Sequence, residues 1–349
     1  MIKGKKIGFF GCKNTTKEAV ESFIYDIGKV DILITIDPVL GKKNNVAGYM
    51  DLREFARDKG IELYSSETYS LKSINDKKWI KSKKIGLGFS IGWQRLIPYD
   101  ILNEIEIGIF GMHGSPDDLP KGRGRSPMNW ALILDKKNFY TNLFKYADNV
   151  DGGGILDTQS FDINDYDTIE NLHYKNRIAM NKLIKKNIST LLSGSFSTKE
   201  QNESDATYFP KRVTDDGFID WSLKSRHIYN LVRAVTEPFH GAFSHIDNDK
   251  IILWSVFPFS NILGYENEKP GRILEVFSNG KFLIKTVDGS IIVNKYYISD
   301  IKKIKKGKIL IGRKYEDIFK DIETRYYSFV KSAKQKEITV EMIRNFYEG

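Results

Sequence analysis

The sequence predicts an α/β domain built on a parallel sheet, followed by a small antiparallel β unit and a helical tail. In the first half, short apolar runs alternate with segments of helical character, a pattern typical of parallel strands joined by crossover helices. From Gly241 onward the runs are short strands, and the Asn-Gly at 279–280 and the Asp-Gly at 288–289 are strong hairpin signals. A length of 349 residues and a hydrophobic content of 41% suggest two domains with ample core.

The N-terminal elements are expected to alternate between strand and helix. The strands are predicted at 5–10, 32–36, 61–64 and 85–91, and the helices at 15–26, at 51–59, within 66–83 and from Pro98 onward, with a polar loop at 38–49. The first turn, Gly8 to Gly11, lacks the G-x-G-x-x-G spacing of a dinucleotide site, and the chain has no G-x-x-x-x-G-K-[ST] loop. We therefore expect neither an NAD or FAD site nor a P-loop.

The remaining elements lead into the second domain. Further strands are predicted at 140–146 and 155–161, a long helix at 167–192, a linker at 193–220, a helix at 222–235 and about five strands from 241 onward. Ser222 is the expected N-cap of the helix at 222–235. The five strands indicate a small barrel, and the tail from Tyr315 is expected to be helical and charged.

Composition restricts the class of protein. Cys12 is the single cysteine, so no internal disulfide and no cysteine zinc cluster is expected, and a reducing cytoplasm fits. No apolar run approaches the length that spans a bilayer, and the N-terminus reads as a first strand rather than a signal peptide. The net charge of +9 could indicate a polyanionic partner such as tRNA, but scattered lysines favour a lysine-rich composition instead. The one dense basic cluster lies at 302–308.

The stretch 108–130, GIFGMHGSPDDLPKGRGRSPMNW, concentrates the chemistry. His113 stands where a buried strand is expected to turn, and Lys121, Arg123 and Arg125 follow in a glycine-broken loop. Because ligands bind beyond the carboxyl ends of strands in open α/β sheets, we expect the loop at 92–97 and this loop to converge on one edge. Guanidinium groups fit phosphate or carboxylate, although a solvated loop is an equal alternative.

A carboxylate near a second strand end could complete a site with His113. Asp148 or Asp151, the latter followed by three glycines, could orient the histidine ring so that it acts as a general base near neutral pH. Asp117 and Asp118 have no histidine or glutamate at ligand spacing, so no metal is expected. The residues alone leave the reaction class open.

Four segments resemble the formyltetrahydrofolate-dependent formyltransferase family. FGMHGSPDDLPKGRGRSPMNWAL is similar to the family signature Asn-x-His-x-Ser, Leu-Pro, Arg-Gly-x-x-Pro, and VDGGGIL is similar to its Asp-x-Gly segment. ATYFPKRVTDDGFIDW and IYNLVRAVTEPFHGAF resemble the linker and the start of the second domain in methionyl-tRNA and sugar formyltransferases. The resemblance covers most of residues 1–300. It implies a Rossmann-like catalytic domain followed by an OB-like barrel.

The resemblance also implies roles for individual residues. His113 matches the catalytic histidine and Asp151 the catalytic aspartate, with Asp148 as the alternative acid or a residue of the folate site. The backbone that holds the pterin corresponds to Arg95, Leu96 and Ile97. The expected contacts of a nucleotide diphosphate are Lys13, Asn14, Arg123 and Arg125, the two arginines otherwise shaping their loop.

The implied activity is transfer of a formyl group from 10-formyltetrahydrofolate to the amine of a nucleotide-linked amino (dideoxy)sugar. Such chemistry belongs to O-antigen or other surface-glycan synthesis, in the cytoplasm, with a homodimer possible by analogy and no membrane or metal. Gly111 departs from the family, because an asparagine that should donate to the oxyanion is expected there. The alternatives are a methionyl-tRNA formyltransferase and a catalytically impaired binding protein for folate or a nucleotide sugar.

The expected domains are the Rossmann-like catalytic domain at 1–200, a linker with a connecting helix at 201–240, the OB-like domain at 241–312 and the helical tail at 313–349.

Overall fold

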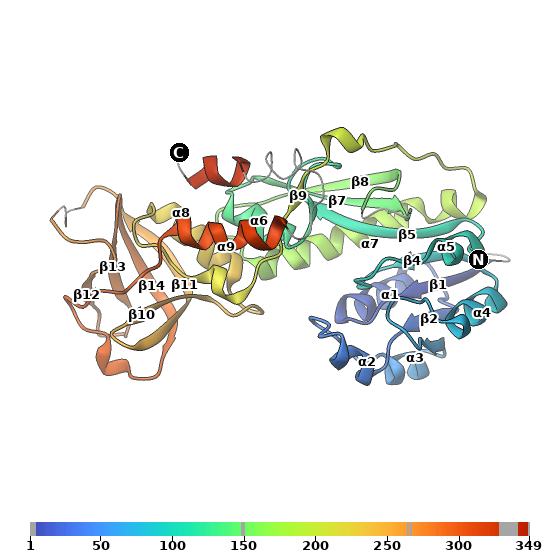
Figure 1. The fold of residues 1–349 in the computed structure, drawn as a ribbon, viewed down its shortest axis with the longest axis horizontal. Coiled ribbons are helices and arrows are strands. Elements are labelled where there is room, and N and C mark those ends of the chain that lie inside the picture. Colours follow the sequence, from blue (N-terminus) through green and yellow to red (C-terminus); the bar gives the residue numbers. More distant parts are fainter. Residues whose placement is uncertain (1–4, 148–150, 264, 266, 328–340, 348–349) are drawn as a thin grey trace. The chain divides into compact units, whose positions relative to one another are not determined.

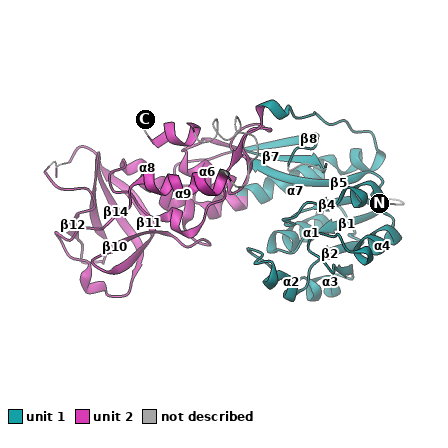
Figure 2. Ribbon diagram, viewed as in Figure 1, with its two compact units in different colours: residues 1–114, 140–161, 175–204 teal, residues 115–139, 162–174, 205–349 magenta. Residues whose placement is uncertain are grey.

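The computed structural model describes residues 5–147, 151–263, 265, 267–327 and 341–347. Contacts between residues divide the chain into two compact units that are discontinuous in sequence (Figure 2). Unit 1 comprises 1–114, 140–161 and 175–204, and unit 2 comprises 115–139, 162–174 and 205–349. These boundaries differ from the expected domain limits because segments on both sides of residue 200 contribute to each unit.

The largest sheet in the described part of the chain has seven strands in the order β3-β2-β1-β4-β5-β7-β8 (Figure 1). The strands from β3 to β5 are parallel, and their order is the 3-2-1-4-5 order of doubly wound dinucleotide-binding folds. The strands span Lys6–Phe10 (β1), Ile32–Thr35 (β2), Glu62–Ser65 (β3), Ile85–Ser90 (β4), Gly108–Ser115 (β5), Asn138–Lys145 (β7) and Ile155–Asp162 (β8). The mixed α/β architecture with a parallel core confirms the predicted fold class.

The last two strands of this sheet are antiparallel to their neighbours. Tyr146 N donates to Ile109 O at 2.7 Å, and Asn142 Nδ2 donates to His113 O at 3.3 Å, so β5 and β7 run in opposite directions. β7 and β8 then form a hairpin, because its connection consists of only 146–154. The expected all-parallel sheet is therefore parallel only in its core.

Helices cover both faces of this sheet. Helices α1, α3 and α7 pack on one face, where Phe9, Phe89 and Leu183 belong to one apolar cluster. Helices α4 and α5 pack on the other face, where Ile80 and Ile101 join a second cluster. The helices span Asn14–Asp26 (α1), Arg53–Asp58 (α3), Ile74–Lys83 (α4), Tyr99–Glu104 (α5) and Ile169–Ser193 (α7).

A short helix replaces the loop expected at 38–49. Helix α2 spans Pro38–Lys43, and the Asp37 carboxylate caps it by accepting from Leu40 N at 2.7 Å. Proline at the first helical position lacks only an N–H that would be unpaired there, so the residue that suggested a loop begins a helix instead.

Unit 2 contains the five-stranded antiparallel sheet that the hairpin signals predicted, in the order β10-β11-β14-β13-β12. The backbone segment 307–311 joins its two edges: Ile311 N donates to His245 O of β10 at 2.7 Å, and Gly307 N donates to Ile273 O of β12 at 2.8 Å. These bonds close the sheet into a barrel, as expected. The strands span Ala242–Ile246 (β10), Asp249–Ser260 (β11), Ile273–Val276 (β12), Phe282–Thr286 (β13) and Gly289–Ile298 (β14).

The connecting region of unit 2 is more ordered than a linker. It contains 3-10 turns η1 (Glu203–Asp205) and η2 (Thr214–Gly217), and β9 (Tyr208–Phe209) pairs with β6 (Arg123–Gly124). The connecting helix is α8, Ser225–Val235, and α6 spans Pro127–Ile133. Ser222 is not the N-cap, because Lys224 occupies that position and the Ser222 hydroxyl donates to Asp220 at 2.7 Å.

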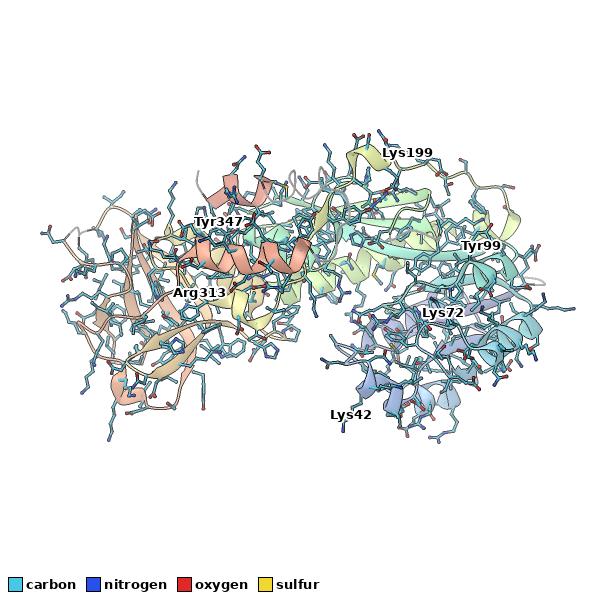
Figure 3. All side chains as sticks on the ribbon, in the orientation of Figure 1. Lys42, Lys72, Tyr99, Lys199, Arg313 and Tyr347 are labelled. Carbon is cyan, nitrogen blue, oxygen red and sulfur yellow. The ribbon has the colours of Figure 1, made fainter. Side chains whose placement is uncertain are left out.

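The helical tail packs within unit 2. Helix α9 spans Tyr315–Tyr327 and follows η3 (Ile301–Lys303), and residues 341–347 form another helical turn. Tyr347, labelled in Figure 3, stacks on Tyr315 with ring centroids 3.6 Å apart. The tail therefore covers apolar surface. None of the helices among the described residues combines the length and apolar character that crossing a bilayer requires.

Candidate active site

The strand order of unit 1 reverses between β1 and β4, and the loops after these two strands are in contact. Thr16 Oγ1, in the first turn of α1, donates to Ile91 O at 2.7 Å. Cys12 Sγ lies 3.7 Å from Gly92 O, and burial raises the pKa of the Cys12 thiol, which favours its neutral form. Such a switch point is where α/β sheets bind their ligands.

His113 lies inside β5, not at the turn where the sequence placed it. β5 continues to Ser115. Because side chains alternate along a strand, His113, Gly111 and Ile109 share one face, the face that carries α4 and α5. Met112 packs on the opposite face. The ring is therefore fixed by a strand, which positions a functional group more firmly than a loop would.

Asp151 lies against the His113 ring. Its Oδ2 is 3.4 Å from His113 Nδ1, and the two side chains are 11% (His113) and 24% (Asp151) exposed. A carboxylate at one ring nitrogen of a histidine orients the ring and stabilises its protonated form. The structure thus brings together the two residues predicted as catalytic. Asp148, the alternative acid, lies outside the described residues.

The loop that carries Asp151 is held by close backbone packing. Gln201 Nε2 donates to Asp151 O at 2.8 Å and to Gly153 O at 2.7 Å. A Cβ on Gly153 would lie 1.7 Å from Lys145 O, so only glycine allows this approach. Asp151 itself adopts a left-handed conformation with φ of 52°. Gly153 thus has a steric role. The local sequence did not reveal Gln201, because it lies 50 residues from Asp151.

Asn142 supports the backbone at His113. Its Nδ2 donates to His113 O, and its Oδ1 accepts from Thr158 Oγ1 at 2.7 Å. The side chain is 1% exposed. This residue joins β5, β7 and β8 behind the histidine, and nothing in the local sequence distinguished it from an ordinary strand residue.

The Tyr146 ring fills the space that a side chain at position 111 would need. A Cβ built on Gly111 would lie 1.9 Å from Tyr146 Cε1 and 2.8 Å from its hydroxyl oxygen. The pKa of Tyr146 is raised to about 12, chiefly by burial, while a hydrogen bond with Ser90 lowers it and the charge of Asp151 raises it. The Tyr146 ring therefore stands where the family's asparagine side chain was expected.

The loop at 92–97 is organised by Tyr69. The Tyr69 hydroxyl accepts from Gln94 N at 3.0 Å, and its ring meets Trp93 edge-on at 5.0 Å. The Arg95 guanidinium lies 5.1 Å from the Tyr69 ring centre. Leu96 is 54% exposed, whereas Ile97 is buried in the apolar cluster. The three predicted folate-binding residues thus differ in how far their side chains are exposed.

Lys13 and Asn14 lie after β1, beside the same switch point. Lys13 is the N-cap residue of α1 and forms a backbone bridge with Tyr49. Asn14 Nδ2 donates to Glu18 at 3.0 Å and is exposed. Both residues belong to unit 1, as His113 does.

Arg123 and Arg125 belong to unit 2. Arg123 is fully buried, and its Nη1 donates to the Tyr208 hydroxyl at 2.8 Å. Arg125 is half-buried, and its backbone N donates to Phe209 O at 2.9 Å. The burial of Arg123 and its bond to Tyr208 are compatible with the loop-shaping role, one of the two alternatives that the sequence left open.

A histidine beside a carboxylate, at the edge where such sheets bind ligands, can take up and return a proton near neutral pH. Among the described residues, no group of three or more histidine, cysteine, aspartate or glutamate side chains is arranged to hold a metal ion.

Comparison with known proteins relates the chain to formyltransferases. Residues 212–314 match the family described as the formyl transferase C-terminal domain. Over 252 residues the chain is 34% identical to the bifunctional polymyxin resistance protein ArnA of Wigglesworthia glossinidia brevipalpis, a match that covers 69% of this chain and 38% of that protein. The chain thus spans less than half the length of this curated relative.

Solved structures share the fold. An N-formyltransferase from Helicobacter canadensis, in complex with folinic acid and dTDP-3-aminofucose, superposes with a TM-score of 0.60 at 20% identity, covering 84% of this chain and 100% of that one. HypX from Aquifex aeolicus in complex with tetrahydrofolic acid gives a TM-score of 0.57 at 14% identity, covering 91% of this chain and 47% of that one.

Proposed function

We propose that this chain, which belongs to the formyltransferase family and is most like its nucleotide-sugar members, transfers the formyl group of 10-formyltetrahydrofolate to the primary amine of a nucleotide-linked amino sugar. The observation that carries the proposal is the pair formed by His113 and Asp151, whose Nδ1 and Oδ2 atoms are 3.4 Å apart at the ligand-binding edge of the sheet. The likeness to a structure that holds folinic acid and a dTDP-amino sugar supports the choice of both substrates.

In this proposal His113 is the general base. An ammonium group cannot attack a carbonyl carbon, so the amine must react in its neutral form and lose a proton as the C–N bond forms. His113 Nε2 accepts that proton, and Asp151 at Nδ1 stabilises the resulting imidazolium. Asn142 and Gln201 hold the two residues in place through the backbone.

The folate side of the proposed site has an unused hydrogen-bond donor. Within the described residues, the buried Trp93 Nε1 has no hydrogen-bond partner. Buried polar groups are rarely left unpaired, and a heteroaromatic pterin carries both donors and acceptors. Arg95, Leu96 and Ile97 would bind the co-substrate beside this donor. When bound, the co-substrate supplies the formyl carbon.

The surface charges do not favour tRNA as the substrate. Three of the five lysines at 302–308 form ion pairs: Lys303 with Asp249, Lys306 with Glu275 and Lys308 with Asp247. Paired lysines present less positive charge to a phosphate backbone. We therefore keep the nucleotide-linked sugar as the proposed acceptor.

The test is incubation of the purified protein with 10-formyltetrahydrofolate and a panel of UDP-, dTDP- and GDP-linked amino sugars, read by the mass gain of a formyl group. We expect one sugar class to be formylated. His113→Asn should abolish product, and His240→Asn, which changes an exposed histidine of unit 2, should not. Formylation of methionyl-tRNA alone, or folate binding without any product, would contradict the proposal.

A further inference from the structure

Formyl transfer needs a hydrogen-bond donor that the side chain at position 111 cannot provide. When the amine nitrogen adds to the formyl carbon, the carbonyl π electrons move to oxygen and the oxygen becomes negatively charged. Donors aimed at this charge commonly supply the largest single contribution to acyl-transfer catalysis. Gly111 has no side chain, so another group must stabilise the charge.

Resting on the function proposed above, we infer that the Tyr146 hydroxyl is this donor. It would hydrogen-bond the formyl oxygen as the amine adds to the formyl carbon. Tyr146 would then be a catalytic residue, and Gly111 the residue that makes room for it.

The Tyr146 hydroxyl lies about as far from position 111 as the absent amide would reach. Its oxygen lies 2.8 Å from where a Cβ of residue 111 would be. An asparagine amide nitrogen stands two bonds, or about 2.5 Å, beyond its own Cβ. The two donors therefore extend a similar distance from the same point of β5, although one comes from residue 111 and the other from beyond the end of β7.

The hydroxyl also lies on the correct face of the sheet. Residues 111 and 113 of one strand project to the same side. Tyr146 packs with the apolar cluster of that side and stacks on Phe144, with ring centroids 5.4 Å apart. Its backbone N is held by Ile109 O at 2.7 Å. The phenol is thus fixed two residues along the strand from His113.

The electrostatic surroundings keep the phenol protonated. The pKa of Tyr146 is raised to about 12, chiefly by burial; a hydrogen bond with Ser90 lowers it and the negative charge of Asp151 raises it. A phenol that keeps its proton at neutral pH can donate a hydrogen bond throughout the reaction.

Asn142 also carries a side-chain amide near His113, but this amide already forms hydrogen bonds within the sheet. Its Nδ2 donates to His113 O, and its Oδ1 accepts from Thr158. Withdrawing it would release the β5 backbone at the catalytic position.

The reaction step balances with these groups. The amine lone pair forms the new C–N bond, one amine proton passes to His113 Nε2, and the formyl oxygen accepts the hydrogen bond of Tyr146 without taking its proton. When the oxyanion electrons re-form the carbonyl, the bond from the formyl carbon to folate N10 breaks, and N10 takes the proton that His113 held. The products are the formamide and tetrahydrofolate.

The first experiment uses Tyr146→Phe, which removes only the hydroxyl. We expect kcat for sugar formylation to fall about 100-fold, the usual effect of deleting one oxyanion donor, with KM for both substrates little changed. The matched control is Tyr64→Phe, whose hydroxyl donates to Asp76 at 2.9 Å elsewhere in unit 1. Wild-type kcat in Tyr146→Phe would overturn the inference while leaving the proposed function intact.

The second experiment moves the donor back to position 111. The single substitution Gly111→Asn should not give an active enzyme, because the new Cβ would lie 1.9 Å from a Tyr146 ring carbon. Tyr146→Ala removes the ring, and adding Gly111→Asn to it should recover about tenfold or more of the lost kcat. No recovery in a double variant that folds and binds folate would count against the exchange of donors.

A spectroscopic readout separates the two proposals when no tested sugar is formylated. The infrared C=O band of bound 10-formyltetrahydrofolate, labelled with ¹³C in the formyl group, should lie at lower frequency in the wild type than in Tyr146→Phe. Identical bands, or failure of the co-substrate to bind, would overturn the inference. A band at lower frequency in the wild type, without turnover of any sugar, would support the Tyr146 contact and contradict the proposed acceptor.

Discussion

Replacing Asp151 with asparagine removes the charge beside His113 and keeps the size of the side chain. Asparagine also tolerates the left-handed conformation that Asp151 adopts, with φ of 52°. The substitution should therefore leave the loop folded while the imidazolium, formed when His113 takes the amine proton, loses its counter-charge.

The separation of the two groups sets the magnitude. Unit charges at the observed 3.4 Å interact by about 5 kcal/mol at a dielectric constant near 20 and by about 1 kcal/mol in water. Because the two side chains are 11% and 24% exposed, we take an intermediate value of about 2–3 kcal/mol. Such a loss in the transition state lowers kcat by about 30- to 150-fold.

The assay is steady-state formation of the formylated sugar, with folate binding and the unfolding midpoint measured on the same preparation. Asp58→Asn is the control, because the Asp58 side chain is 63% exposed and lies 3.7 Å from that of Arg57, which is also exposed. A wild-type kcat in Asp151→Asn, with folding and folate binding retained, would refute the role given to the carboxylate.

Three further expectations concern stability and substrate binding. Gly153→Ala places a Cβ 1.7 Å from a backbone carbonyl oxygen, so the free energy of unfolding should fall by about 1–3 kcal/mol in urea titrations, with kcat falling too. Burial would raise the pKa of Asp135, but Arg226 lowers it below its usual value. Asp135 therefore stabilises the fold above pH ~4, and this contribution disappears as pH falls through the lowered pKa. The urea midpoints of Asp135→Asn and wild type should converge in acid. Arg123→Met should cost about 1–3 kcal/mol of stability with KM for the sugar unchanged, whereas Arg125→Met should raise that KM and leave the unfolding midpoint in place.

Much of unit 1 followed from local patterns. Strands β1, β2, β4, β7 and β8 and helix α7 lie within a few residues of their predicted positions, because burial on a sheet or on a helix face imposes a periodicity that the residues must carry. The barrel strands were marked by hairpin turns, whose residue preferences are equally local. Asp151 was identified as a site residue by resemblance, and its distance from His113 agrees with that assignment.

The errors arose where a local signal had two meanings. Pro38 suggested a loop but occupies the first position of α2, and Ser222 has the side chain of an N-cap but bonds to Asp220 instead. For Arg123 the sequence left a phosphate contact and a loop-shaping role open, and its partner Tyr208 lies 85 residues away. In each case the deciding partner is set by packing, which a single sequence does not display.

The sequence by itself determined the α/β class, the barrel that follows, the histidine with its acid and the departure at Gly111. Only the tertiary structure decided which side chain stands where the asparagine was expected. β5 and β7 run antiparallel with residue 109 beside residue 146, and this register carries the Tyr146 ring across Gly111. Periodicity reveals which residues are buried, whereas register reveals which of them meet, because strand pairing depends on the fit of whole strands and not on any single residue.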